Sequence, residues 1–258
     1  MGVITEVALR IYLQEKYTAH ATFGFINLEA ASKALYEISR AGYVHDFWML
    51  CGKHTVNLGY PQAPEMIETI VALYTAAKDQ RIIDVRKEKW LEKAKKYDAK
   101  ELDPSFADKY ASDYNGIATA AGQSFSWGVC NIWPIKRIPE IYNVLEMSLL
   151  KYENIIKDSG GKKLWYVVAA GGTKHPLCEL CYGFTADRSN HEIRVKAYEA
   201  FQELQKMAIN QGAPFYDLGR LPAATYLWER ARTMHTFLRT MKKALDPNEI
   251  MNPGSLML

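Results

Sequence analysis

The sequence of 258 residues lacks several features that mark large classes of protein. No apolar run approaches the length that a membrane-spanning helix needs, and the N-terminus has no charged region followed by an apolar stretch and a cleavage site. Only four cysteines are present, and their scattered positions are unlike a secreted disulfide framework. We therefore expect a cytoplasmic protein without a membrane span.

A surplus of either charge is also missing, since 32 basic and 29 acidic residues leave a net charge of +3. The most basic stretch, residues 86–100, is interrupted by acidic residues and is typical of a solvated helix face. We expect no nucleic-acid partner. Aromatic residues are present instead, with 16 Tyr and 6 Trp. Such rings either line a pocket for an organic ligand or fill a tyrosine-rich core.

Patterns of apolar residues predict an alternation of strands and helices along the chain. Asn27, and Ser189 or Asn190, are suited to cap the start of a helix, whereas Gly42 and Ser159-Gly160-Gly161 are suited to end one. Residues 98–126 have no regular apolar pattern, which is typical of a long loop or a lid. The predicted strands are 1–12, 20–26, 44–50, 164–169 and 178–185, and the predicted helices are 28–41, 64–80, 83–96, 138–158, 191–209 and 223–244. This order lacks the strict alternation of a parallel doubly wound sheet, so we predict an α+β fold in which helices back an antiparallel sheet.

The C-terminal stretch 238–256, LRTMKKALDPNEIMNPGSL, is the most specific part of the sequence. A helix ends there, Asp246-Pro247 forces a turn, and Pro253-Gly254 follows. This tail resembles the C-terminal signature of the FAD-linked oxidases of the vanillyl-alcohol oxidase and p-cresol methylhydroxylase superfamily, in which a DPxxxxNPG tail returns to the flavin domain. The opening GVITEVALRI, residues 2–11, is similar to the last strand of that family's FAD-binding domain, where GxxTE precedes an apolar strand.

The resemblance implies a division of the chain into three parts. Residues 1–14 would be the terminal strand of an FAD-binding domain otherwise absent from this sequence. Residues 15–221 would form the substrate domain, or cap, with a ferredoxin-like fold, and residues 222–258 a C-terminal helix and a tail next to the flavin. The missing FAD-binding domain would be a separate subunit or another part of a longer gene product, and both remain open.

The resemblance also implies site residues. FAD would be approached by the backbone of residues Gly2, Val3, Ile4 and Thr5 and by the side chain of Asn252. The His motifs of the hydroxy-acid branch are missing here. In the phenol branch of the family, a Tyr followed directly by an Arg stabilises a phenolate. Here Tyr216 is at the position of the Tyr, and Asp217 is at the position of the Arg. Arg220, three residues further on, would take over the role of that Arg. An ordinary buried Tyr216 is the alternative.

Two further residues are candidates for the substrate site, and one motif suggests a metal. His54 follows a predicted strand and could act as a base or bind a ligand, and the alternative is an ordinary exposed loop histidine. Trp127 could form the wall of a pocket, and the alternative is packing in the core. The spacing of Cys178 and Cys181 suits zinc, but further ligands are lacking, and residues three apart on a strand point to opposite faces. We therefore expect buried, unlinked thiols and no metal.

The leading hypothesis is the substrate-binding half of an FAD-dependent oxidoreductase that oxidises an alcohol, an alkylphenol or a 2-hydroxy acid by hydride transfer to flavin N5. Its partners would be an FAD-binding domain or subunit, a small organic substrate and an electron-acceptor protein, and we expect an oligomer. The alternative is a non-catalytic α+β binding or assembly subunit that retains the cap fold. A self-sufficient zinc or thiol enzyme is the third and weakest hypothesis.

Overall fold

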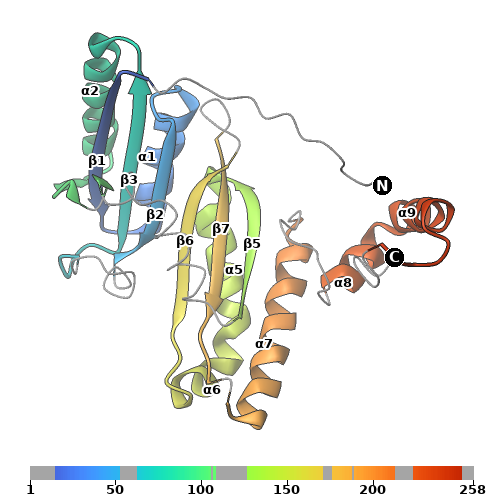
Figure 1. Ribbon diagram of the computed structural model, residues 1–258. Helices are drawn as coiled ribbons and strands as arrows, with labels where there is room; N and C mark the ends of the chain where they lie inside the picture. The colour runs from blue at the N-terminus through green and yellow to red at the C-terminus, as the bar shows by residue number, and fades with distance from the viewer. Residues whose placement is uncertain are drawn as a thin grey trace.

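The chain folds around a single antiparallel sheet of seven strands, seen in Figure 1. The computed structural model describes residues 15–52, 63–105, 107–108, 127–170, 176–187, 189–212 and 223–251. The strand order is β4-β1-β3-β2-β6-β7-β5, and every neighbouring pair is antiparallel. This confirms the predicted α+β fold. Among the described residues, no helix is both long and apolar enough to cross a membrane.

The described elements follow one another in two similar sets of strands and helices, with two further helices at the C-terminal end. The strands are β1 (Tyr17–Phe25), β2 (Asp46–Cys51), β3 (Thr69–Ala77), β4 (Lys100–Leu102), β5 (Trp127–Pro134), β6 (Lys163–Ala170) and β7 (Leu177–Phe184). The α-helices are α1 (Leu28–Arg40), α2 (Gln80–Lys96), α5 (Ile138–Leu149), α6 (Glu153–Asp158), α7 (His191–Asn210), α8 (Ala223–Arg230) and α9 (Arg232–Leu245), and the 3-10 helices are η3 (Ile135–Arg137) and η4 (Leu150–Tyr152).

The predicted capping residues begin and end the helices as expected. The side chain of Asn27 accepts a hydrogen bond from the backbone N–H of Ala30 at 2.8 Å, and α1 ends before Gly42, which has φ 73°. Asn190 accepts from the backbone N–H groups of Glu192 and Ile193 at the start of α7. These caps occupy donors that the first helical turn leaves without an intrahelical partner, so the helix boundaries follow from local sequence.

The main core lies between the sheet and the layer formed by α1, α2, α5 and α7. It holds Trp90 and Tyr182, which are almost fully buried, and the indole N–H of Trp90 donates to the carbonyl of Tyr43 at 3.0 Å. A smaller apolar cluster on the opposite face of the sheet packs Trp48 and Leu50 against Ala63, Ile67 and Ala107. The helices α1, α2, α5 and α7 all lie on the first face, so they leave the second face available for other contacts.

The segment predicted as a helix over 64–80 is a strand in its central part, so that prediction is wrong. Pro64 opens a turn, in which its carbonyl accepts from the N–H of Ile67 at 2.8 Å, and β3 then runs from Thr69 to Ala77 between β1 and β2. Residues on both faces of this central strand are buried, so the run is apolar throughout instead of alternating. A continuous apolar run does not distinguish a strand from a helix by its period.

The prediction of one helix over 223–244 is also corrected, because α8 and α9 are separate. The break lies at Ala231, with φ −118° and ψ 45°, although the sequence has neither Gly nor Pro there. Arg230 donates to the carbonyl of Ile209 at 2.8 Å and fixes the end of α8 on α7. Across the break the rings of Trp228 and His235 stack at 4.8 Å, so tertiary contacts compensate for the interrupted helix.

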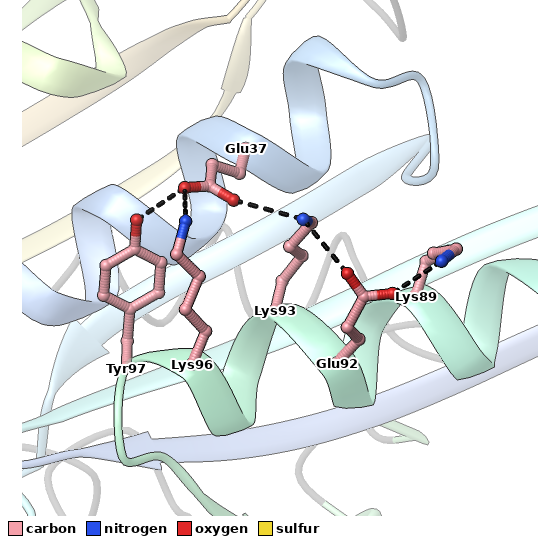
Figure 2. A network of polar contacts seen from close by, with 6 residues as sticks. All are labelled: Glu37, Lys89, Glu92, Lys93, Lys96 and Tyr97. Atoms are coloured by element: carbon pink, nitrogen blue, oxygen red, sulfur yellow. Dashed lines mark hydrogen bonds and ion pairs between the residues drawn. The ribbon is translucent and has the colours of Figure 1, made fainter.

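A polar network joins α1 to the C-terminal end of α2, as Figure 2 shows. The carboxylate of Glu37 accepts from Lys96 Nζ and from the Tyr97 hydroxyl, both at 2.6 Å, and lies 3.4 Å from Lys93 Nζ. Lys93 also pairs with Glu92. The hydrogen bond from Lys96, followed by that from Tyr97, lowers the pKa of Glu37 from 4.5 to about 2.

We expect Glu37→Gln to lower the free energy of unfolding at pH 7 by about 1 kcal/mol, since the group is only partly buried. A carboxylate whose pKa is depressed on folding stabilises the protein above the unfolded pKa of 4.5, and this contribution is lost as the pH falls towards about 2. The difference between the wild type and the variant should therefore shrink between pH 4.5 and pH 2 in denaturant titrations. Glu88→Gln, on the exposed side of α2, is the control and should leave stability nearly unchanged. A difference that is constant over this pH range would contradict the assignment.

Candidate functional site

The face of the sheet turned away from the helices is only half-buried over β5, β6 and β7. Along β5 the residues alternate, so that Val129 and Trp133 are buried in the main core whereas Cys130 and Ile132 lie on the other face and are half-exposed. Glu179 of β7 and Tyr166 of β6 are half-exposed on the same face. We call the surface of β5, β6 and β7 on this side the open face.

Two thiols and a carboxylate come together on the open face. The register places Cys130 of β5 directly opposite Cys181 of β7, and Tyr166 of β6 opposite Cys181 on its other side. The sulfur atoms of both cysteines and a carboxylate oxygen of Glu179 all lie within 4.8 Å of one another. Burial, followed by the hydrogen bond with Cys130, raises the pKa of Cys181, and burial likewise raises the pKa of Tyr166. These side chains are therefore protonated at neutral pH and act as hydrogen-bond donors.

A hollow of about 500 Å³ lies on the helix side, between the end of β2 and the residues of α5, β6 and β7. The Tyr182 hydroxyl donates to Glu146, and Lys163 pairs with the same carboxylate. Burial, followed by the charge of Glu146, raises the pKa of both Tyr142 and Tyr182. Glu146 and Lys163 neutralise each other, so the polar groups that line this hollow bind one another.

A larger hollow of about 790 Å³ lies on the outer side of the helix layer, against α1, the end of α2 and the start of α5. Its charged side chains pair within the wall: Glu29 with Lys33, and Glu37 with the lysines of Figure 2. Lys136 lies over the ring of Tyr36 at 4.1 Å. The charges of this hollow thus stabilise the packing of α1 and leave no strong field for a charged ligand.

The C-terminal helix carries an apolar stripe that the described residues do not cover. Met234 and Phe237 are 54% and 58% exposed, and Leu245 and Ile250 follow near the end of α9. Figure 1 shows α8 and α9 to one side of the sheet and its helix layer. Spacing of three and four residues places the apolar residues on one side of α9, as in a helix that packs against another surface. The stripe is a candidate docking surface.

A buried ion pair fixes the chain after α9. The Lys242 ammonium donates to Asp246 and to the carbonyl of Met251, and Asp246 accepts from the backbone N–H groups of Ile250 and Met251, each at 2.9 Å. Lys242 and Asp246 are 8% and 5% exposed. The hydrogen bond from Lys242 lowers the pKa of Asp246. The Asp-Pro turn of the tail motif is therefore held by its own aspartate.

Most of the site residues predicted from the sequence lie outside the described residues. These are Gly2, Val3, Ile4, Thr5, His54, Tyr216, Arg220 and Asn252. Trp127 is described, and its ring lies on the helix side of β5, with its centroid 5.9 Å from that of Tyr198 and 5.6 Å from that of Phe201. These contacts are those of packing between β5 and α7, and a role in substrate binding stays a prediction.

The groups on the open face were not identified from the sequence. The predicted thiols are free: Cys178 and Cys181 are buried and unlinked, as expected. The partner of Cys181, however, is Cys130, on a strand that the sequence analysis did not assign. Burial alternates along WGVCNIWP, residues 127–134, but apolar residues occur on both faces, so the sequence does not show on which face Cys130 lies.

Comparisons with known proteins find a family that matches the second half of the chain and solved structures that share its fold. Residues 133–256 match the model of a family described as FAD linked oxidases, C-terminal domain. A crystal structure of p-cresol methylhydroxylase with substrate bound has a TM-score of 0.72 at 14% identity, covering 94% of this chain and 53% of that one. A 4-ethylphenol oxidase from Gulosibacter chungangensis, in an isoeugenol complex, has a TM-score of 0.69 at 14% identity, covering 94% and 54%.

An alkyldihydroxyacetonephosphate synthase structure is also similar, with a TM-score of 0.62 at 11% identity over 93% of this chain and 45% of that one. The chain therefore spans about half the length of these solved structures. The family match includes the tail motif at 246–254, and the shared antiparallel sheet includes the first half of the chain. Residues 133–256 thus match the C-terminal domain of FAD-linked oxidases, and the likeness to these solved structures shows that the chain shares their fold.

Proposed function

We propose that this chain is the substrate-binding half of an FAD-dependent oxidoreductase, completed by an FAD-binding domain or subunit, that oxidises an alcohol, an alkylphenol or a 2-hydroxy acid. The observation that carries the proposal is the open face: a half-exposed sheet surface on the side opposite α1, α2, α5 and α7. The names of p-cresol methylhydroxylase and 4-ethylphenol oxidase support phenols as the first substrates to test.

The described side chains of the open face fit the substrate side of a flavin. An isoalloxazine is flat and largely apolar, and Val168 and Ile132 offer an apolar surface beside the polar group of Tyr166. Such a surface suits a flat ring, with a few polar groups that orient a small organic substrate. The residues proposed to contact FAD itself, Gly2 to Thr5 and Asn252, would add the polar edge.

Bound FAD would supply the hydride acceptor, at flavin N5, and this chain would position the substrate carbon. The Tyr166 hydroxyl has a hydrogen bond with Cys181, and its oxygen would accept a hydrogen bond from a substrate hydroxyl. Closing the open face against an FAD-binding domain would exclude water and strengthen that hydrogen bond. Tyr216 and Arg220 remain the proposed groups that stabilise a phenolate.

The stripe on α9 is proposed to dock on the FAD-binding domain. Met234 and Phe237 are more than half exposed, and two side chains of this size would stabilise an interface by several kcal/mol if buried. The ion pair of Lys242 and Asp246 fixes the chain that leaves this helix. The C-terminal tail would then approach the flavin domain from a defined direction.

The proposal is tested on the protein purified from its own source under native conditions. Native mass spectrometry and flavin absorbance would be measured together, and a panel of alkylphenols, aromatic alcohols and 2-hydroxy acids would then be added without oxygen. A flavin that copurifies and is bleached by one class of compound supports the proposal. A colourless protein with no flavin in any assembly would overturn it and favour a non-catalytic binding subunit.

In the complete enzyme, Tyr216→Phe should lower kcat by about 10²-fold, because the hydroxyl is proposed to stabilise charge on the substrate oxygen. The flavin content should be unchanged, which separates loss of chemistry from loss of folding. Tyr152→Phe, in η4 among the helices, is the matched control and should keep full turnover. Unchanged turnover in Tyr216→Phe would remove this residue from the site.

In the chain alone, the uncovered stripe should cause self-association. Phe237→Glu should weaken this association about tenfold or more, since burying a Phe side chain stabilises an interface by about 1.5–3 kcal/mol. The measurement is sedimentation over a range of protein concentrations. Thr236→Glu adds the same charge at an exposed position on the same helix and should have little effect. Equal effects of both substitutions would argue against docking through the stripe.

A further inference from the structure

The sheet register brings three potential metal ligands together on the open face. Cys130 and Cys181 are directly opposite each other on β5 and β7, and Glu179 lies two residues before Cys181, so all three side chains are on one face. The Cys181 thiol donates to Glu179 Oε1 at 3.5 Å, and the three ligand atoms lie within 4.8 Å of one another. No second group of three such ligands comes as close within the part of the chain that the structure describes.

These distances fit a tetrahedral metal with a small adjustment of side chains. Zinc binds thiolate sulfur at about 2.3 Å and carboxylate oxygen at about 2.1 Å, which places two sulfur ligands about 3.8 Å apart. The backbone positions are already fixed by the pairing of β5 with β7 and of β7 with β6. The ligand atoms already lie within 4.8 Å of one another, so shifts of the side chains by about 1 Å bring them to these distances.

We propose that Cys130, Glu179 and Cys181 bind a zinc ion, or a divalent metal of similar preference for sulfur. On binding, each thiol loses its proton to solvent, and the two thiolates and the carboxylate together carry one negative charge more than the metal neutralises. Tyr166 pairs with Cys181 in the register and is half-exposed, so it lies beside the proposed site. Three protein ligands with one position left for water is a common arrangement for zinc.

The site does not depend on the flavin and is tested on the full 258-residue chain. The chain is reduced, freed of metal and titrated with Co²⁺, whose thiolate complexes show an intense charge-transfer absorption, and Zn²⁺ is then added as a competitor. We expect one equivalent of Co²⁺ to give this absorption and Zn²⁺ to abolish it. Cys130→Ser and Cys181→Ser should each remove most of the absorption, and Glu179→Gln should weaken binding by about tenfold or more.

Cys178→Ser is the matched control, because Cys178 lies on the same strand and is also buried, but points into the main core. It should keep the full absorption. No charge-transfer absorption in the wild type, or one that survives Cys130→Ser, would overturn the proposal. If the variants do not fold, the wild type decides: Zn²⁺ should protect the half-exposed Cys130 from alkylation, located by mass spectrometry, and alkylation at an unchanged rate would overturn the site.

Discussion

The fold depends on one antiparallel pairing at the centre of the sheet, between β2 and β6. Trp48 pairs with Val168 and Leu50 with Tyr166, and this ladder joins the strands of the first half of the chain to those of the second. Because α1, α2, α5 and α7 lie on the same face, the joined sheet has one continuous main core, and none of these four helices covers its other face. The side chains of Cys130, Tyr166 and Glu179 lie on that second face as a consequence.

The parts of the fold that could be predicted from the sequence are those set by interactions between residues close together in the chain. Caps such as Asn27 and Asn190 and the stop at Gly42 act within a few residues, so the bounds of α1 and α7 follow from the sequence. The central strand β3 does not, because its burial on both faces is set by neighbouring strands that the local pattern does not reveal. The break at Ala231 is likewise set by contacts of Arg230 and Trp228 that arise only in the folded chain.

The candidate site illustrates the same limit for side chains. The sequence draws attention to Cys178 and Cys181 because they are close along the chain, yet the strand turns them to opposite faces. Cys130 is 51 residues away and meets Cys181 only through the register of β5 and β7. The tail motif at 246–254, by contrast, predicted the family, and the matched residues 133–256 contain it. A short motif can thus point to a matching family, whereas the arrangement of side chains in a site depends on strand pairing.

The ion pair of Lys242 and Asp246 has a consequence for the binding of a second domain. Asp246 holds the backbone N–H groups of Ile250 and Met251, so the first residues after α9 are ordered within this chain alone. Ordering a residue's backbone costs about 1–2 kcal/mol of conformational entropy. Residues that the ion pair already orders do not incur this entropy cost again when a second domain binds. A segment that is pre-organised in this way binds with higher affinity. Asp246 would then affect the rate and the affinity with which a second domain binds, without taking part in the reaction.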